Sequence, residues 1–352
     1  LNKAEESESF KKMMTLKKYK EKEDKWIGYG VATYAELTGI GSKISVAPGM
    51  PINTGSETAT VEIDGTGSIT GTFAIASHGQ GLETSLAQII ADELGVNPIN
   101  IKVIQGDTSK AKHGTGTYAS RSAVIGGGAA IKTSKILKDK ILKVAAHLFE
   151  TDPNNIQIED GIISSINSNK SINFSELAKS VYSDMETLPV ELRESLYATS
   201  SYDPIFGATT TATHIALVEV DKQTFKVNVL KYLVSEDCGR IINPLIVDGQ
   251  VHGGVAQGIG VALFEEVNYD HEGQLTTANL VDYKIPTASE IPKIDVFHLE
   301  NFLPKNIGKF KGMGEGGTIG APAAIANAVA DALSKFNVEI NELPITHDKI
   351  YN

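Results

Sequence analysis

The chain has 352 residues, of which 41% are hydrophobic and 21% are charged, and its formal net charge at pH 7 is −11. This length and composition predict a globular protein of one or two domains. The negative balance argues against nucleic acid or an anionic membrane as the main partner, because both bind a basic face. Small molecules and other proteins remain as partners.

A single cysteine, Cys238, is present in the sequence. One cysteine cannot form an internal disulfide, and it cannot supply the ligands of a cysteine-based metal cluster. No apolar run approaches the roughly 20 residues that a membrane-spanning helix needs. We therefore predict a cytoplasmic protein without a membrane span. Because the sequence begins at Leu1 instead of Met, we expect a fragment or a processed piece.

Residues 1–25 carry many charges of both signs and few apolar side chains. This composition is typical of a solvated helix or tail at the end of a preceding unit. The β-rich run Trp26–Thr38 then predicts the first strand of the main domain. We expect that domain to span 26–352, with subdomains at about 26–200 and 201–352.

The first subdomain alternates strands and helices, with glycine-rich turns between them. Its predicted elements are a hairpin over Thr58–Ile63 and Ser68–Ser77, a helix over Glu83–Leu94, a strand over Ile99–Ile104 and a helix from about 123 to 150. A peripheral insertion follows over 151–200. The order of strand, turn, helix and strand predicts an α/β (α+β) fold of layered mixed sheets with flanking helices.

The second subdomain is predicted to contain a strand pair, a long helix, a further strand and a last helix. These elements cover Thr209–Val220, Lys226–Ser235, Pro244 to about Phe264, the region near Ile294–Leu299, and Thr318 to about Phe336. Thr318 is the expected N-cap of the last helix, so Glu315 would precede a helix N-terminus, where the helix dipole favours an anion.

Glu315 lies in a glycine-dense loop, GMGEGG, at 312–317. These glycines leave little side-chain bulk, so we expect backbone with positive φ that approaches a large bound group. The alternative is an acidic residue that merely decorates a helix start. The flanking glycines favour the bound group, because simple capping does not require them.

Four glycine-bearing segments stand out, at 78–83, 114–122, 237–243 and 312–317. Most follow a strand or precede a helix, which is the usual position of ligand contacts in α/β folds. Together they predict one extended, phosphate-bearing ligand held by backbone N–H groups and by a few side chains, namely Gln80, Ser120 and Arg121. Arg121 is expected to pair with a phosphate, the alternative being a structural salt bridge.

Common phosphate and metal motifs are absent from the sequence. There is no G-x-x-x-x-G-K-[ST] loop and no G-x-G-x-x-G that opens a βαβ unit. Five histidines lack metal-ligand spacing and are expected to be structural or exposed: His78, His113, His147, His214 and His252.

Five ordered motifs resemble the molybdenum-binding large subunit of the xanthine dehydrogenase/aldehyde oxidase family. They are GQGLET at 79–84, GTYASRS at 116–122, DCGRIINP at 237–244, GQVHGGVAQGIG at 249–260 and GMGEGG at 312–317. The resemblance covers roughly Trp26–Phe336, and its serine-arginine loop and GEGG ending are most similar to carbon monoxide dehydrogenase-like members. His78 departs from the glutamine-type residue of many relatives.

This resemblance implies a site in which Glu315 is the catalytic general base and no side chain ligates the metal. The implied cofactor-binding residues are Gly79, Gln80, Gly81, Thr117, Tyr118, Ala119, Ser120, Arg121, Ser122, Cys238, Asn243, Gln257, Gly314 and Gly316.

The implied cofactor is molybdenum-molybdopterin, in its cytosine dinucleotide form. The implied reaction oxidises an aldehyde, carbon monoxide or an N-heterocycle with oxygen derived from water. The 2Fe-2S and FAD centres would lie on partner subunits, because one cysteine cannot hold a cluster. Family large subunits are about twice as long, so the chain resembles their C-terminal half, with the N-terminal half as a further partner.

Two other interpretations remain open at the level of the sequence. One is a non-catalytic cofactor-binding or assembly subunit of the same fold, against which the presence of Glu315 speaks. The other is an unrelated α/β protein whose glycine-rich loops bind a nucleotide or another phosphate.

Overall fold

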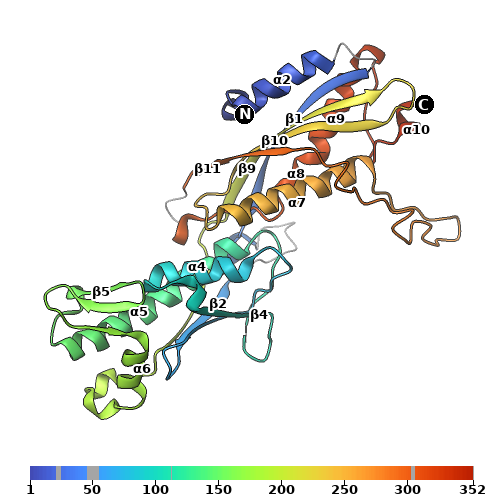
Figure 1. Ribbon diagram of the computed structural model, residues 1–352. Helices are drawn as coiled ribbons and strands as arrows, with labels where there is room; N and C mark the ends of the chain where they lie inside the picture. The colour runs from blue at the N-terminus through green and yellow to red at the C-terminus, as the bar shows by residue number, and fades with distance from the viewer. Residues whose placement is uncertain (21–24, 46–54, 112, 303–305, 352) are drawn as a thin grey trace.

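Two four-stranded mixed sheets organise the chain into two lobes, which lie one above the other in Figure 1. The structure is a computed structural model that describes residues 1–20, 25–45, 55–111, 113–302 and 306–351. A smaller three-stranded sheet belongs to the lower lobe. The mixed sheets with flanking helices confirm the predicted fold class.

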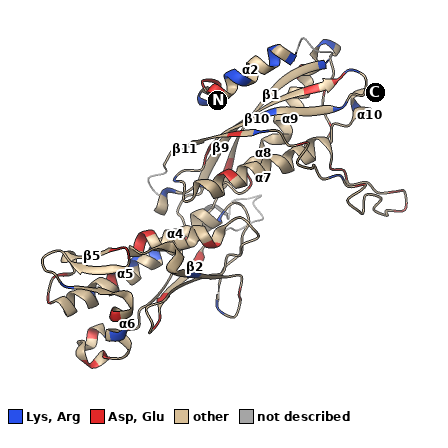
Figure 2. Ribbon diagram, in the orientation of Figure 1, with Lys and Arg blue, Asp and Glu red and all other residues tan. Residues whose placement is uncertain are grey.

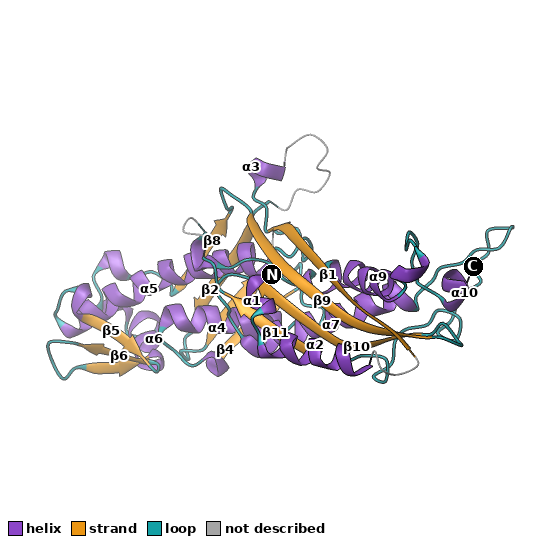
Figure 3. Ribbon diagram, turned by 90° about the horizontal axis from the view of Figure 1, so that it is seen from above, coloured by secondary structure: helices purple, strands orange, loops and turns teal. Residues whose placement is uncertain are grey.

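The upper sheet has the strand order β1-β9-β10-β11. Its strands are β1 (Lys25–Thr38), β9 (Ala208–Asp221), β10 (Val227–Asp237) and β11 (Ile294–Leu299). The first three are antiparallel, and β11 is parallel to β10. Figure 3 shows the long strands β1, β9 and β10 side by side through the middle of an elongated molecule.

Helices α7 (Pro244–Leu263) and α9 (Ala321–Ala332) cover one face of this sheet and share its core of Ala, Val and Ile side chains. On the other face, α2 (Glu8–Lys20) buries Met13 against Ile215 and Leu233. Lysines along α2 are visible in Figure 2, and two of them pair with Asp331 and Glu219. The segment predicted to be a solvated helix or tail is thus largely helical, and one side of its helix packs on the sheet.

The lower sheet has the order β4-β3-β2-β8, with helices packed against it. The elements are β2 (Glu57–Ile63), β3 (Ile69–Phe73), β4 (Ile101–Gln105), β8 (Tyr197–Tyr202), α4 (Leu82–Leu94) and α5 (Gly127–Phe149). The smaller sheet and its helix are β5 (Ile156–Glu159), β6 (Ile162–Ser165), β7 (Ser171–Asn173) and α6 (Phe174–Tyr182). The short helices elsewhere are α1 (Asn2–Glu5), α3 (Ser42–Ser45), α8 (Gly316–Ile319) and α10 (His347–Tyr351).

Local signals in the sequence explain most of these boundaries. The hairpin between β2 and β3 forms as predicted, and α4 ends at Gly95, whose φ of 70° is left-handed. Asn173 and Glu176 form the capping box that starts α6. The predicted helix after residue 123 forms as α5, preceded by a π-helical turn over Ser122–Gly126.

One strand lies in a different place from the sequence prediction. β1 was expected in the first subdomain, but it pairs along its whole length with β9 in the upper sheet. The reason is that pairing between strands distant in the chain leaves no local signal in the sequence. None of the described helices combines the length and the apolar character that crossing a bilayer requires.

β1 lies unusually close to α9 because it carries two glycines where they meet. A Cβ atom at Gly30 would lie 2.2 Å from the carbonyl oxygen of Ala324, and one at Gly28 would lie 2.1 Å from that of Ala328. Real Cβ atoms do not approach backbone so closely, so only glycine permits this contact.

We predict that Gly30→Ala lowers the free energy of unfolding by about 1–3 kcal/mol, because α9 must move away from β1. The matched control is Gly65→Ala, since a Cβ atom there meets no atom within 4 Å. Chemical denaturation measures both variants. Equal stability of the two would contradict the close packing of β1 on α9.

Candidate active site

A cavity of about 370 Å3 lies where the two lobes meet, and all four glycine-bearing segments contribute to its wall. This volume is within the range of small-molecule sites. The lower lobe contributes the turn before α4 and the loop before α5, and the upper lobe contributes the loops after β10 and before α8. Segments far apart in the sequence therefore converge, as predicted.

The turn before α4 presents Gln80 to the cavity. Gly79 and Gly81 have φ values of 105° and 69°, which glycine adopts without strain. The Oε1 atom of Gln80 accepts hydrogen bonds from the His78 backbone N–H at 2.7 Å and from the Ser77 hydroxyl at 3.2 Å. Its Nε2 is buried without a hydrogen-bond partner among the described residues. A buried donor left unpaired costs about 1–3 kcal/mol, so a bound acceptor fits here.

The loop before α5 holds two residues in a strained conformation. Ala119 and Ser120 have φ values of 49° and 47°, in the left-handed region that non-glycine residues disfavour. Strain of this kind concentrates at functional sites. Gly312 packs so tightly on this loop that a Cβ atom there would lie 2.1 Å from the Ser120 carbonyl oxygen. The loop before α5 therefore packs closely against the loop before α8.

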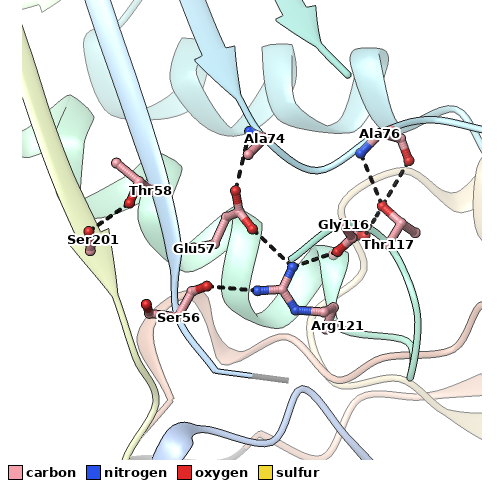
Figure 4. A network of polar contacts seen from close by, with 10 residues as sticks. Ser56, Glu57, Thr58, Ala74, Ala76, Gly116, Thr117, Arg121 and Ser201 are labelled. Carbon is pink, nitrogen blue, oxygen red and sulfur yellow. Dashed lines mark hydrogen bonds and ion pairs between the residues drawn. The ribbon is translucent and has the colours of Figure 1, made fainter. Parts of the chain in front are cut away.

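Arg121 anchors the same loop from inside the protein (Figure 4). Its Nη1 donates to Glu57 Oε2 at 2.9 Å and to the Gly116 carbonyl at 2.6 Å, and its Nη2 donates to the Ser56 carbonyl at 3.0 Å. Both charged side chains are fully buried. The guanidinium therefore does not line the cavity, and its geometry is that of the structural salt bridge, in place of the expected phosphate contact.

The loop after β10 is tied to the loop before α8 by Asp237. Its carboxylate accepts from Lys311 Nζ at 2.7 Å and from Asn301 Nδ2 at 2.9 Å. Burial raises the pKa of Asp237, but these hydrogen bonds outweigh burial and hold the pKa below its usual value. The carboxylate thus stays charged, and it fixes Cys238 and Lys311 in the cavity wall.

Asn243 joins the two lobes beside the cavity. Its side-chain oxygen accepts from the Ile246 backbone N–H at 3.2 Å and caps α7, while its Nδ2 donates to Gln88 Oε1 on α4 at 2.9 Å. Leu82, the first residue of α4, and Asn243, the N-cap of α7, both line the cavity. The N-termini of these two long helices therefore lie at the cavity. Helix N-termini favour bound anions.

The loop that carries Glu315 differs from the prediction in its backbone. None of its glycines has a positive φ. They are required by close contacts instead, since a Cβ atom at Gly316 would lie 2.6 Å from the Tyr34 hydroxyl and one at Gly317 would lie 2.6 Å from the Val251 carbonyl. Gly314 in the cavity wall is less crowded, since a Cβ atom there would make an ordinary contact with Ser120 Oγ at 3.8 Å.

The helix after this loop also begins differently. Glu315 is the N-cap residue of α8, so it does precede a helix N-terminus. Thr318 is not an N-cap, because it lies inside α8 and α9 begins after Gly320. The Thr318 hydroxyl instead donates to the Gly254 carbonyl at 2.9 Å and to Gln257 Oε1 at 3.1 Å.

The side chain of Glu315 lines the cavity and accepts a hydrogen bond from the Ser120 hydroxyl at 2.7 Å. A second carboxyl group, that of Glu36 on β1, lies beside it, with Oε1 at 3.5 Å from the Ser120 Oγ. The pKa of Glu36 is raised to about 7, mainly by burial and to a smaller extent by the contact with Glu315. The site therefore contains a pair of adjacent carboxyl groups.

The predicted site residues fall into two groups. Those that line the cavity are Gln80, Thr117, Tyr118, Ser120, Ser122, Cys238, Asn243, Gly314 and Glu315. Those outside its lining are Gly79, Gly81, Ala119, Arg121, Gln257 and Gly316. Sequence reasoning missed Glu36, which lies outside the lining, and did not name the lining residue Lys311. Arg240 and Gln250 also line the cavity; they lie within the segment 237–243 and the motif 249–260 but were not named as site residues. Glu36 gave no signal, because it is a lone acid within a β-rich run.

We predict that Arg121→Met lowers the free energy of unfolding by about 3–5 kcal/mol, because it leaves the buried Glu57 carboxylate without its cation. Glu57→Gln in the same background should recover part of this loss, since it removes the unpaired charge. Denaturant titration of the single and double variants measures the coupling. Purely additive effects would contradict a buried ion pair.

Comparison with known proteins identifies the family. The family model described as molybdopterin cofactor-binding domain matches residues 3–292. The large subunit of nicotine 6-hydroxylase from Paenarthrobacter nicotinovorans is 39% identical over 330 residues, which cover 94% of this chain and 40% of that protein. The large chain of carbon monoxide dehydrogenase from Hydrogenophaga pseudoflava is 32% identical over 327 residues, which cover 92% and 40%.

The fold agrees with that of a solved relative. The crystal structure of quinoline 2-oxidoreductase from Pseudomonas putida 86 matches with a TM-score of 0.91 and 40% identity, over 99% of this chain and 44% of that chain. The chain spans less than half the length of each of these relatives. By sequence and by fold, the chain belongs to the molybdopterin cofactor-binding domain family of the molybdenum hydroxylases, as its motifs predict.

Proposed function

We propose that this chain holds the molybdenum-molybdopterin cofactor of a hydroxylase or dehydrogenase and supplies Glu315 as the general base for oxidation of a carbon centre. The observation that carries this proposal is the convergence of four glycine-bearing segments on one cavity, with the Glu315 carboxylate in its wall. Family membership supports the binding of this cofactor, and the position of Glu315 in the cavity wall supports its role as the general base.

The residues in the wall fit an extended anionic cofactor. The unpaired Nε2 of Gln80 offers a hydrogen-bond donor, and Thr117, Ser120 and Ser122 add hydroxyl groups. Gly79 and Gly116 lie next to the lining residues Gln80 and Thr117, and a Cβ atom at either glycine would meet no atom within 4 Å. No group of three or more His, Cys, Asp or Glu that could hold a metal ion occurs among the described residues.

For the form of the cofactor we propose the cytosine dinucleotide. A dinucleotide carries a pyrophosphate in addition to the pterin. The N-termini of α4 and α7 both lie at the cavity, and their dipoles favour two phosphate groups more than one.

Glu315 is placed to act as the base of the reaction. When bound, the molybdenum centre would supply the two-electron oxidation that adds water-derived oxygen to a carbon atom. Glu315 would accept the proton of the water-derived nucleophile, and a positioned base of this kind contributes about 10²–10⁴-fold in rate. The Ser120 hydroxyl orients the carboxylate by donating to Oε2 at 2.7 Å.

Among the predicted substrates, an aldehyde, carbon monoxide or an N-heterocycle, we favour the N-heterocycle. The relatives named for nicotine and for quinoline are 39% and 40% identical to this chain, against 32% for the carbon monoxide dehydrogenase chain. Both of the former names specify a nitrogen heterocycle. The cavity wall is also rich in apolar side chains, among them Leu86, Ile89 and Ile242, which suit an organic ring system.

The complete enzyme would contain further parts. The chain covers about 40% of its relatives' length, so we propose that the remainder of a large subunit completes the site. Electrons would leave through 2Fe-2S and FAD centres on partner subunits, because the one cysteine of this chain cannot ligate a cluster. The competing proposal is a non-catalytic cofactor-binding or assembly subunit.

We predict that Glu315→Gln, in the complete enzyme, retains molybdenum at the wild-type level and lowers kcat by at least about 100-fold, because the base is lost while the cavity keeps its shape. Metal analysis and steady-state kinetics measure the two quantities. The matched control is Glu62→Gln, an exposed glutamate on β2. Wild-type turnover of Glu315→Gln at full molybdenum content would refute the assignment, and absence of molybdenum from the wild-type enzyme would refute the cofactor.

A further inference from the structure

Glu36 and Glu315 form a pair of carboxyl groups beside a single hydroxyl group. Ser120 Oγ lies 2.7 Å from Glu315 Oε2 and 3.5 Å from Glu36 Oε1. The contact with Glu315 is, after burial, a further cause that raises the pKa of Glu36. The other oxygen of Glu36, Oε2, is buried and has no hydrogen-bond partner among the described residues. Two carboxylates in contact repel each other, so such a pair holds a proton more readily than a single glutamate.

The nearby cations are paired with other carboxylates: Arg121 with Glu57, Arg240 with Asp92 and Lys311 with Asp237. Within the described part of the chain, no Lys or Arg forms an ion pair with either glutamate, and Lys311 in the cavity wall is paired with Asp237 at 2.7 Å. On β9, burial lowers the pKa of His214 to about 4, so this ring is neutral at pH 7. Its Nδ1 lies 2.9 Å from the Tyr232 hydroxyl of β10.

The remaining titratable neighbours are neutral or negative. On β1, Tyr34 lies two residues before Glu36, and its hydroxyl donates to the Gly316 carbonyl at 2.9 Å, directly behind Glu315. Burial raises the pKa of Tyr34, and the charges of Glu36 and of Glu236 on β10 raise it further, so the phenol stays neutral at pH 7. A negative charge on Glu36 therefore acts on Glu315 without an ion pair from Lys or Arg to either carboxyl group among the described residues.

We propose that Glu36 is a positioning residue that makes Glu315 a stronger base: the two carboxylates together take up the one proton released by the water-derived nucleophile and hold it between them beside Ser120. The proton moves from the nucleophile to Glu315, is shared with Glu36, and leaves to solvent before the next turnover. No electron is transferred in this step. The inference rests on the proposed function of Glu315.

The raised pKa of Glu36 agrees with this arrangement. A pair that releases its last proton near pH 7 is a base matched to neutral conditions, whereas a single glutamate with a pKa near about 4.3 is a weaker one. Below about pH 7 the pair already holds its proton and cannot accept another as readily.

The test is the pH dependence of kcat/KM for Glu36→Gln in the complete enzyme. The wild-type rate should fall as the pH drops through about 7, and Glu36→Gln should move this acid limb down by at least about one pH unit, because the variant lacks the second carboxyl group of the pair. The control Glu62→Gln should keep the wild-type limb. A merely structural role of Glu36 would lower the rate at every pH and leave the limb in place, which would overturn the proposal.

Infrared difference spectroscopy gives a second readout that requires no turnover. Between about pH 6 and pH 8, the wild-type protein should lose the stretching band of a protonated carboxyl group, and Glu36→Gln should not. The same band in both proteins would overturn the proposal. These results can be distinguished from those of the Glu315→Gln test. If Glu315→Gln were inactive but the acid limb of Glu36→Gln stayed at the wild-type pH, the proposed role of Glu36 would be refuted and the proposed function of Glu315 would stand.

Discussion

The buried ion pair between Arg121 and Glu57 is the interaction on which the site depends. It fixes the loop before α5 from inside the protein, and that loop carries Ala119 and Ser120 in left-handed conformations that would otherwise relax. Ser120 in turn donates to Glu315 across the junction of the lobes. A charged pair with no contact to the cavity thus determines the orientation of the carboxylate within it.

Close backbone packing then brings the upper lobe to the same point. Gly312 packs against Ser120, Gly316 against Tyr34 and Gly317 against α7. These three contacts hold the Glu315 loop in place. Asp237 and Lys311 tie this loop to the end of β10, and Asn243 ties α7 to α4. The cavity is therefore a product of contacts between segments from both lobes, made by small residues, by the capping residue Asn243 and by the ion pair of Asp237 with Lys311.

Much of this arrangement was predictable from the sequence. Local signals mark the ends of helices, as at Gly95 after α4 and Asn173 before α6. The glycine-bearing segments predicted the cavity wall. The interior role of Arg121 was not predictable, because its partner Glu57 lies on β2, far from the loop of Arg121 in the sequence. Glu36 was missed for the same reason, since only the pairing of β1 with β9 places it beside Glu315. Glycines at 312–317 were identified correctly as informative, but close packing and not positive φ explains them.

An experimental structure of the complete enzyme with its cofactor bound would show whether the cofactor occupies the cavity between the lobes. We predict that the cofactor lies in the cavity between the lobes. One of its hydrogen-bond acceptors should be within hydrogen-bond distance of Gln80 Nε2, and the Glu315 carboxylate should face the molybdenum. A cofactor bound elsewhere, or a Glu315 side chain turned away from it, would contradict the account.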